Sequence, residues 1–279
     1  MYQEAIKQGG VAVVTGAANG VGKVAATRFA QAGLSVVLAD RDAEALAAAQ
    51  TDIQAAAAGA NLLAVPTDVS DAAAVASLAD AAFDMGEVAV LMNNAGIGRS
   101  TTSWGHLDNW RQLIEVNLFG VIHGVHAFVP RMIDAARPAV VINTGSKQGI
   151  TTPPGNPGYN VTKAGVKVVT EMLAHDLRKA SAPISAHLFV PGFTYTNMIA
   201  SFIPEKPPSA WTSEQTVDHF IARMAAGDFY ILCPDNDVTP ERDRARVAWA
   251  VGDIIENRPA LSRWHPDYAE TFAQHEAGT

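Results

Sequence analysis

Six short apolar runs recur along the first two thirds of the chain and predict buried β-strands. They are rich in β-branched residues and cover 11–15, 34–39, 61–65, 88–92, 139–144 and 184–190. Continuous runs of this length suit strands buried on both faces of a sheet. The stretches between them, including 20–32, DAEALAAAQTDIQAAAA and DAAAVASLADAAFDM, favour helix. This alternation predicts an α/β fold with a parallel sheet and helices on both faces. No linker or repeat interrupts the pattern, so we expect one domain over residues 1–279.

The pattern changes after residue 192. The segment GFTYTNMIASFIPEKPPSAW is loop-like, and a helix over 212–226, a strand over 229–232 and a charged helix over 239–256 follow it. Long irregular segments in compact domains are usually functional or mobile. We therefore expect a substrate lid over about 193–227 and a helical C-terminal extension over about 239–279. The charged helix carries an apolar stripe, Val247, Val251, Ile254 and Ile255. The stripe can pack on its own subunit or on a neighbour, and we favour the neighbour.

Composition excludes several classes of function. The 279 residues carry a net charge of −8 and no run of lysine or arginine, so neither nucleic acid nor an anionic membrane is an expected partner. The N-terminus has no basic start followed by an apolar stretch, and we expect a cytoplasmic protein. The single cysteine, Cys233, cannot form an internal disulfide and is interpreted as a buried structural thiol. DNDVTPERD has Pro240 where a calcium loop needs glycine, so it is read as a turn and no metal is expected.

A glycine-rich turn, TGAANGVG, directly follows the first predicted strand and leads into a predicted helix. Gly16, Gly20 and Gly22 let the backbone approach a pyrophosphate, and the helix N-terminus favours negative charge. Asp40 closes the second strand 18 residues after Gly22, where an acidic residue can bind ribose hydroxyls. Its charge favours NAD over NADP, although the neighbouring Arg41 leaves a 2'-phosphate possible. Asp42 is available to cap the next helix.

Tyr159 and Lys163 in YNVTK lie four positions apart, one turn of a helix. A tyrosine with a pKa near 10 needs help to act as a base at neutral pH, and a nearby ammonium can stabilise its phenolate. We expect Asn156 to cap this helix and Pro157 to occupy its first turn. We also expect an apolar stripe on another face to pack against the protein: Val161, Ala164, Val168 and Met172.

Ser146 ends the fifth predicted strand, where it can hydrogen-bond a substrate oxygen beside the phenol. Lys147 follows it, and of two readings, contact with an anionic substrate or an outward side chain, we favour the second, because adjacent side chains at a strand end diverge. Asn117 lies in a long helical stretch. From the residues alone it is a buried polar residue of that helix.

The ordered motifs over residues 10–196 resemble those of short-chain dehydrogenases/reductases. TGAANGVG is similar to the family's cofactor loop, Asp68 and Val69 to the pair beside the adenine, and NNAG (93–96) to the turn after the fourth strand. The segment 191–196 is similar to the one that meets the nicotinamide. The family's four catalytic residues match Asn117, Ser146, Tyr159 and Lys163. By this resemblance Asn117 holds a water that links Lys163 to solvent.

The resemblance implies a Rossmann-like, doubly wound sheet of seven mainly parallel strands, usually in a homotetramer. It also implies hydride transfer between a nicotinamide and an alcohol or carbonyl carbon. The expected cofactor contacts are Gly16, Ala18, Asn19, Gly20, Val21, Gly22, Asp40, Arg41, Asp68, Val69, Asn94, Ala95, Gly96, Tyr159, Lys163, Pro191, Gly192, Thr194 and Thr196. The chain departs from the family at Gly145, where a second serine often stands, at Lys147, and at its C-terminal end.

Apolar side chains dominate the segments expected to wall the substrate pocket. The predicted substrate residues are Ile97, Trp104, Ser146, Gln148, Ile150, Phe193, Tyr195, Met198 and Phe202. They favour an uncharged hydrophobic or aromatic secondary alcohol over a sugar acid. Two alternatives remain: a non-catalytic nicotinamide-sensing protein, and a dehydratase or epimerase of the extended version of this fold. The usual glycine spacing of the second alternative, G-x-x-G-x-x-G, differs from the one here.

Overall fold

A computed structural model describes residues 2–7, 9–200 and 202–278. Within these residues seven parallel strands form one sheet in the order β3-β2-β1-β4-β5-β6-β7. The strands are β1 Val11–Thr15, β2 Ser35–Asp40, β3 Leu62–Pro66, β4 Val88–Asn93, β5 Ala139–Thr144, β6 Ile184–Val190 and β7 Tyr230–Leu232. Every residue of β1, β4 and β5 is buried, as the continuous apolar runs predict. The predicted strands are confirmed, with ends that differ by one residue at most.

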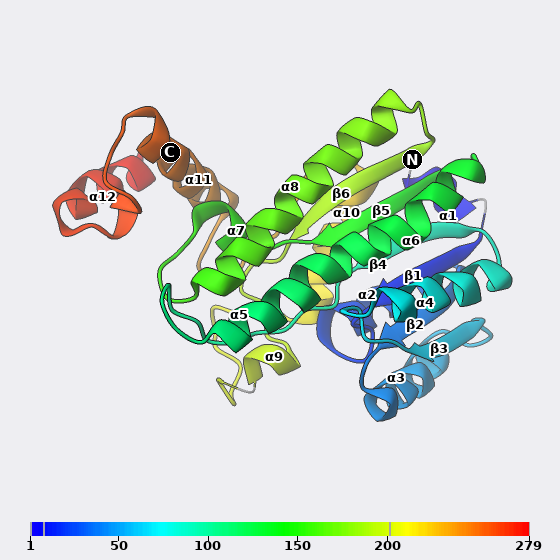
Figure 1. Cartoon of the computed structure of the whole chain (residues 1–279). Helices are drawn as coiled ribbons and strands as arrows, with labels where there is room; N and C mark the ends of the chain where they lie inside the picture. The colour runs from blue at the N-terminus through cyan, green and yellow to red at the C-terminus, as the bar shows by residue number, and fades with distance from the viewer. Residues whose placement is uncertain (1, 8, 201, 279) are drawn as a thin grey trace.

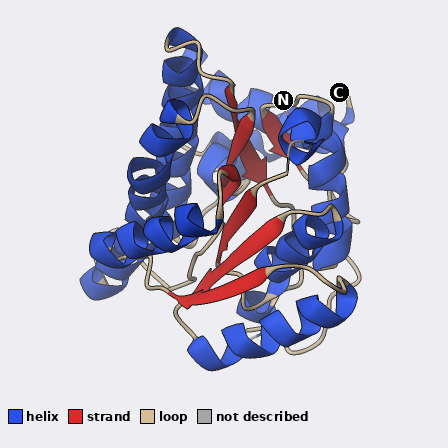
Figure 2. Ribbon diagram, turned by 90° about the vertical axis from the view of Figure 1, so that its right-hand side faces the viewer, coloured by secondary structure: helices blue, strands red, loops and turns tan. Residues whose placement is uncertain are grey.

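Helices cover both faces of this sheet, which confirms the doubly wound fold (Figures 1 and 2). One face carries α1 Tyr2–Lys7, α2 Gly20–Gln31, α3 Ala43–Ala56 and α10 Ser213–Ala225. The other carries α4 Ala72–Met85, α5 Leu107–Leu113, a π-helical turn η1 Ile114–Phe119, α6 Gly120–Asp134 and α8 Pro157–Lys179. Phe29, Phe189 and Phe220 are fully buried on the first face, and Leu78, Leu91 and Phe128 on the second.

The prediction of a lid over about 193–227 was wrong for its second half. Val217, Phe220 and Met224 of α10 are buried in the core beside α2, and Phe220 contacts Phe189 of β6 at a ring distance of 4.5 Å. The apolar face of α10 therefore serves the core. The irregular part over 193–211, with the short helix α9 Asn197–Ala200, lies at the carboxyl edge of the sheet. Residue 201 of the predicted lid lies outside the described residues.

The face of α8 that packs inward is not the one expected. Its buried residues include Thr162, Lys163, Val166 and Leu173, whereas Val161, Val168 and Met172 are about half exposed. The predicted packing of this stripe inside the subunit is therefore wrong. The reason is that Tyr159 and Lys163 turn toward the sheet edge and bring the small and polar residues of α8 inward with them.

The N-terminus of α8 is capped from another segment. Asn156 occupies the cap position, but its side chain makes no capping hydrogen bond, so the predicted cap was wrong. Instead, Thr101 Oγ1 accepts a hydrogen bond from the backbone N–H of Gly158 at 2.9 Å and donates one to Asn156 Oδ1 at 2.7 Å. Asn156 Nδ2 donates to the Arg99 carbonyl at 2.9 Å. These contacts join the start of α8 to the loop after β4.

Leu107–Asp134, which comprises α5, η1 and α6, forms one continuous helix of 28 residues. By length and composition it is the one helix in the described part of the chain that could cross a bilayer. Phe128 and Met132 of this helix are buried against the sheet and α4, and Gly165 of α8 packs close to Leu118. An apolar helix that covers one face of a sheet passes the same test, so we assign no membrane role to it.

The C-terminal extension projects beyond the sheet beside α7 Gln148–Thr151 (Figure 1). It contains α11 Pro240–Ile255, the 3-10 turns η2 Ser262–Trp264 and η3 Pro266–Tyr268, and α12 Ala269–Ala277. Trp249 is its centre: the indole donates a hydrogen bond to Ser262 Oγ at 2.8 Å, packs edge-on against Phe272 and lies beneath the Arg258 guanidinium. Val251, Ile254 and Ile255 of the predicted apolar stripe remain exposed.

Candidate active site

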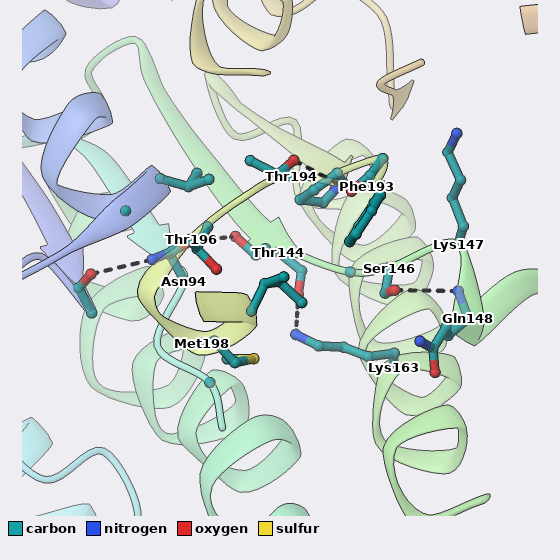
Figure 3. A pocket seen from close by; sticks show the side chains of 18 of the residues that line it. Asn94, Thr144, Ser146, Lys147, Gln148, Lys163, Phe193, Thr194, Thr196 and Met198 are labelled. Carbon is teal, nitrogen blue, oxygen red and sulfur yellow. Dashed lines mark hydrogen bonds between the residues drawn. The ribbon is translucent and has the colours of Figure 1, made fainter. Parts of the chain in front are cut away.

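A cavity of about 530 Å³ opens at the carboxyl edge of the sheet, beside the neighbouring strands β1 and β4, between which the strand order reverses its direction. Parallel sheets bind ligands at this switch point, because the loops after the two strands leave in opposite directions. The ends of β1, β2, β4, β5 and β6 all supply lining residues, as do α8, α9 and α11. Figure 3 shows the side chains that converge here.

The glycine turn after β1 fits closely because it lacks side chains. Gly16 has φ +69° and Gly20 φ +52°, a region that favours glycine. A Cβ on Gly22 would lie 2.1 Å from the Gly16 carbonyl oxygen, and one on Gly20 would lie 3.2 Å from Thr196 Cγ2. All three glycines line the cavity at the start of α2. This cradle fits a pyrophosphate, which would meet backbone N–H groups and the positive end of α2.

Asn94 ties three strand ends together at the floor of the cavity. Its Nδ2 donates to the Thr15 carbonyl at 3.0 Å, and its Oδ1 accepts from Thr144 Oγ1 at 3.2 Å. Thr15 Oγ1 in turn accepts from the backbone N–H groups of Asn94 and Ala95 at 2.9 and 3.1 Å. These bonds fix the ends of β1, β4 and β5 relative to one another, which positions the glycine turn against Ser146 and Lys163.

Asp40 lies at the β2 end of the same cavity. Its Oδ2 accepts from the Ala18 N–H and its Oδ1 from the Asp42 N–H, both at 3.2 Å. Asp42 caps α3 by accepting from the Ala45 N–H at 3.0 Å, as predicted. A carboxylate has about four lone-pair sites, so Asp40 still has acceptors for two ribose hydroxyls. Arg41 is exposed and does not line the cavity.

Tyr159 and Lys163 lie side by side on α8 and both line the cavity. The Lys163 ammonium lies 5.8 Å from the centre of the Tyr159 ring and donates to the Thr144 carbonyl at 2.7 Å. Burial lowers the pKa of Lys163 from 10.5 to about 8, so at pH 7 the side chain remains largely protonated. Burial raises the pKa of Tyr159 above its ordinary value of 10.0, and the hydrogen bond with Ser146 partly opposes that rise.

Ser146 and Asn117 occupy different depths of the site. Ser146 lines the cavity beside Tyr159, and its Oγ accepts from the Gln148 N–H at 3.2 Å (Figure 3). Asn117 is fully buried behind the cavity on the π-helical turn η1. Its side chain accepts from the Ile97 N–H at 2.7 Å and donates to the Ile97 carbonyl at 3.0 Å. Asn117 therefore holds the loop after β4 in place, and single π-turns of this kind are frequent at functional sites.

The model of one protein family, short chain dehydrogenase, matches residues 10–207, and the fold and the site agree with it. The chain is a short-chain dehydrogenase. It is 35% identical over 271 residues to 1-deoxy-11-beta-hydroxypentalenate dehydrogenase of Streptomyces exfoliatus, which covers 95% of this chain and 97% of that protein. A nicotinamide nucleotide is accordingly its cofactor, and an alcohol and a ketone are the two sides of its reaction.

Two solved structures of short-chain dehydrogenases resemble this one. The enzyme from Burkholderia phymatum, solved in complex with NAD, has a TM-score of 0.81 and 33% identity, covering 90% of this chain and 95% of its own. The enzyme from Sphingobium yanoikuyae, solved in complex with NADPH, has a TM-score of 0.75 and 22% identity, covering 88% and 95%. At that lower identity the likeness shows the fold alone.

Most of the cofactor contacts expected for this short-chain dehydrogenase line the cavity, but four do not. Ala18 is buried, with its N–H on Asp40, and Arg41 points to solvent. Asp68 accepts from the N–H and Oγ of Ser70 at 2.9 and 2.7 Å, which lowers its pKa. Val69 packs against α6: a Cβ on Gly120 of that helix would lie 2.7 Å from Val69 Cγ2.

Of the predicted substrate residues, Ser146, Gln148, Phe193 and Met198 line the cavity of the dehydrogenase, and the other five do not. Trp104 and Phe202 are 92% and 68% exposed, and the Tyr195 hydroxyl donates to the Pro204 carbonyl at 2.5 Å. Ile150 packs inward against the cluster around Val166 and Leu188. Ile97 presents its backbone to Asn117. An apolar composition located these loops, but it could not show which of their side chains turn inward.

The structure adds lining residues that the sequence motifs did not indicate: Thr144, Gly145, Lys147, Asn197, Ile199, Asp235, Val238 and Arg246. Lys147 does not point outward as predicted, because its backbone is already helical (φ −55°, ψ −30°) and no longer alternates as a strand does. Its ammonium lies 2.6 Å from Asp243 and 3.7 Å from Asp235. The last three lining residues come from beyond β7, in the region where the chain departs from the family's pattern.

Proposed function

We propose that this short-chain dehydrogenase oxidises a secondary alcohol with a largely apolar body, prefers NAD, and uses Tyr159 as its catalytic acid and base. The observation that carries the proposal is the convergence of Tyr159, Ser146 and Lys163 on one cavity that the glycine turn also lines. A phenol, a hydroxyl and an ammonium at one point are the groups that proton transfer from an alcohol requires.

In the proposed mechanism, Ser146 Oγ hydrogen-bonds the substrate oxygen and holds it beside Tyr159 Oη. Tyr159 takes the hydroxyl proton during oxidation and returns it during reduction. The Lys163 ammonium, fixed by the Thr144 carbonyl, stabilises the phenolate that forms. A nicotinamide nucleotide held by the glycine turn and Asp40 would supply the hydride acceptor or donor. Asn117 acts as a positioning residue, since it holds the Ile97 backbone beside the site.

The preference for NAD follows from Asp40. Its carboxylate lines the cavity where the adenosine ribose would lie, and a 2'-phosphate there would face like charge. Arg41, the residue that could offset this charge, is exposed and outside the cavity. The Burkholderia phymatum enzyme, which was solved in complex with NAD, supports the same preference.

The substrate class follows from the end of the cavity that lies beyond Ser146. Phe193, Met198, Ile199 and Val238 supply apolar surface to the cavity, beside the polar side chains of Lys147, Gln148, Asp235 and Arg246. The Streptomyces exfoliatus relative, named as a hydroxypentalenate dehydrogenase, supports a substrate that carries a hydroxyl group. We further propose that the protein works in the cytoplasm as a homo-oligomer, a dimer or a tetramer, because α8 exposes an apolar stripe that a second copy can cover.

The deciding experiment compares wild type with Tyr159→Phe on a panel of hydrophobic secondary alcohols and ketones. NADH and NADPH binding is measured first by fluorescence titration, and turnover is then followed with the preferred nucleotide. We expect tighter binding of NADH, an unchanged NADH affinity in Tyr159→Phe, and a fall in kcat of about 10²- to 10⁴-fold.

Full activity in Tyr159→Phe would overturn the mechanism. Nucleotide binding without turnover of any alcohol or ketone in wild type would instead favour a sensing protein. Reaction of sugar substrates alone would overturn the proposed apolar substrate class.

A further inference from the structure

We propose that Arg246 recognises an anionic group, such as a carboxylate, on the substrate. This inference rests on the proposed function and deepens it, because it names a feature of the substrate. It also revises the expectation of an uncharged substrate: an apolar body would carry one negative charge at a distance from the reacting carbon. Nothing in the family's catalytic motifs supplies this residue, which lies 39 positions beyond the end of the family match at residue 207.

Arg246 comes from the C-terminal extension but lies at the substrate end of the cavity. It lines the same cavity as Ser146, Gln148 and Phe193. The chain places it there through Lys147, which follows Ser146 and whose ammonium is 2.6 Å from Asp243 of α11. Asp243 and Arg246 are three residues apart, so they share one face of α11. The side chain of Arg246 is 17% exposed, which leaves it partly shielded from bulk water.

Its charge is only partly matched by the neighbouring acids. Glu276 of α12 accepts from Arg246 Nε at 3.0 Å through Oε1 and from Arg242 Nη2 at 3.0 Å through Oε2. Two guanidinium groups therefore share one carboxylate, so Glu276 is not a dedicated partner of Arg246. Burial is the main cause that lowers the pKa of Arg263 to about 10, and repulsion by the neighbouring Arg246 acts in the same direction. Of these three arginines, only Arg246 lines the cavity.

Two further acids near α11 already have partners: Asp235, which lines the cavity, and Asp243, which does not. Asp235 accepts from the backbone N–H groups of Phe193, Asp237 and Val238 at 3.1, 3.1 and 2.8 Å. Asp243 is paired with Lys147. Neither carboxylate accepts a hydrogen bond from Arg246 in the described part of the chain, although the charge of Asp243 acts on Arg246 through space.

Arg246 keeps the donors that an anion needs. Among the residues that the structure describes, Nε is the guanidinium nitrogen of Arg246 that makes a hydrogen bond. The pair Nη1 and Nη2 remains, and this fork matches the two oxygens of a carboxylate. Because Lys147 adjoins Ser146 and pairs with Asp243, which lies one turn before Arg246 on α11, we assign the anion to the substrate rather than to the nucleotide.

The test uses one alcohol skeleton with and without a charge: trans-4-hydroxycyclohexanecarboxylate and its amide, with NAD. Wild type is expected to show a KM for the carboxylate about 10- to 100-fold below that for the amide, with similar kcat values. Arg246→Gln should abolish this difference, and Arg246→Lys should retain part of it, because it keeps the charge but loses the fork. Calorimetric titration of the enzyme with cyclohexanecarboxylate and cyclohexanecarboxamide, in the presence of NAD, measures the same preference without turnover.

Arg242→Gln is the matched control, since Arg242 binds the same Glu276 but does not line the cavity. It should keep the preference for the carboxylate. Equal binding of carboxylate and amide by wild type, binding of neither, or equal loss of preference in both glutamine variants would each overturn the inference. So would a tenfold weaker NADH affinity in Arg246→Gln, which would assign the residue to the nucleotide. The proposed function stands or falls separately, on the turnover of uncharged alcohols and on Tyr159→Phe.

Discussion

Lys163 is a cation in a site that is almost closed to water, with 4% of its surface exposed. Its pKa of about 8 means that burial penalises the charged form. Below pH 8 the folded and unfolded chains both hold the proton, and the penalty is constant. Between pH 8 and 10.5 the unfolded chain holds a proton that the folded chain has released, so stability rises with pH. Above 10.5 the penalty has disappeared.

We therefore expect the free energy of unfolding of wild type, relative to Lys163→Met, to rise by up to about 3 kcal/mol between pH 7.5 and 10.5 in the absence of nucleotide. Urea denaturation of the two proteins at a series of pH values measures the difference, in which the other titrating groups largely cancel. A flat difference would show that Lys163 is better solvated than its surroundings indicate.

At the scale of the element, α8 depends on a cap that belongs to another segment. Thr101 is buried and satisfies the Gly158 N–H, which has no partner within the helix. Replacing Thr101 with valine keeps the shape but removes the acceptor. We expect Thr101→Val to lower the free energy of unfolding by about 1–2 kcal/mol and to raise the KM for substrate, because the start of α8 carries Tyr159. Thr102→Val, at the exposed neighbouring position, is the control, and an equal effect in both variants would contradict the role of the cap.

This cap is also an example of a contact that the sequence alone could not predict. Tyr159, Lys163, Asp40 and the glycine turn were found because their geometry is local: one helical turn, or one strand end followed by a helix. Thr101 could not be found in this way, since its partner lies 57 positions away and only the fold brings the two together. Asn156 was chosen as the cap on local preference alone, and the tertiary contact with Thr101 took precedence.

At the scale of the molecule, the largest departure from the sequence-based prediction is an apolar face of α8 that stays exposed. Val161, Val168 and Met172 lie on one exposed face of α8, and Phe119 of η1 is 40% exposed. The hydrophobic pattern predicted that the stripe would be buried, but a pattern cannot distinguish burial within a chain from burial between chains. The parallel sheet and its two covered faces could be predicted, because continuous apolar runs that alternate with helices allow few other arrangements.

We expect Val168→Asp to shift the protein from an oligomer to a smaller species, because burying an unpaired charge at a subunit contact is unfavourable. Light scattering coupled to size-exclusion chromatography measures the mass. Ile254→Asp, on the exposed stripe of α11, should leave the contact through α8 intact, so the protein should remain a dimer or a larger oligomer. A monomeric wild type would contradict the proposal, and dissociation by Ile254→Asp alone would move the contact to the C-terminal extension.

The residues that line the cavity come from two parts of the chain, one inside the family match and one beyond it. The residues proposed to move the proton lie inside the family match at 10–207, whereas Asp235, Val238 and Arg246 lie beyond it. Changes in the tail can therefore alter which alcohol enters while the proton-transferring residues stay the same. In this lineage, chemistry and choice of substrate can be inherited separately, so relatives that share Tyr159 and Lys163 but differ after β7 are expected to act on different compounds.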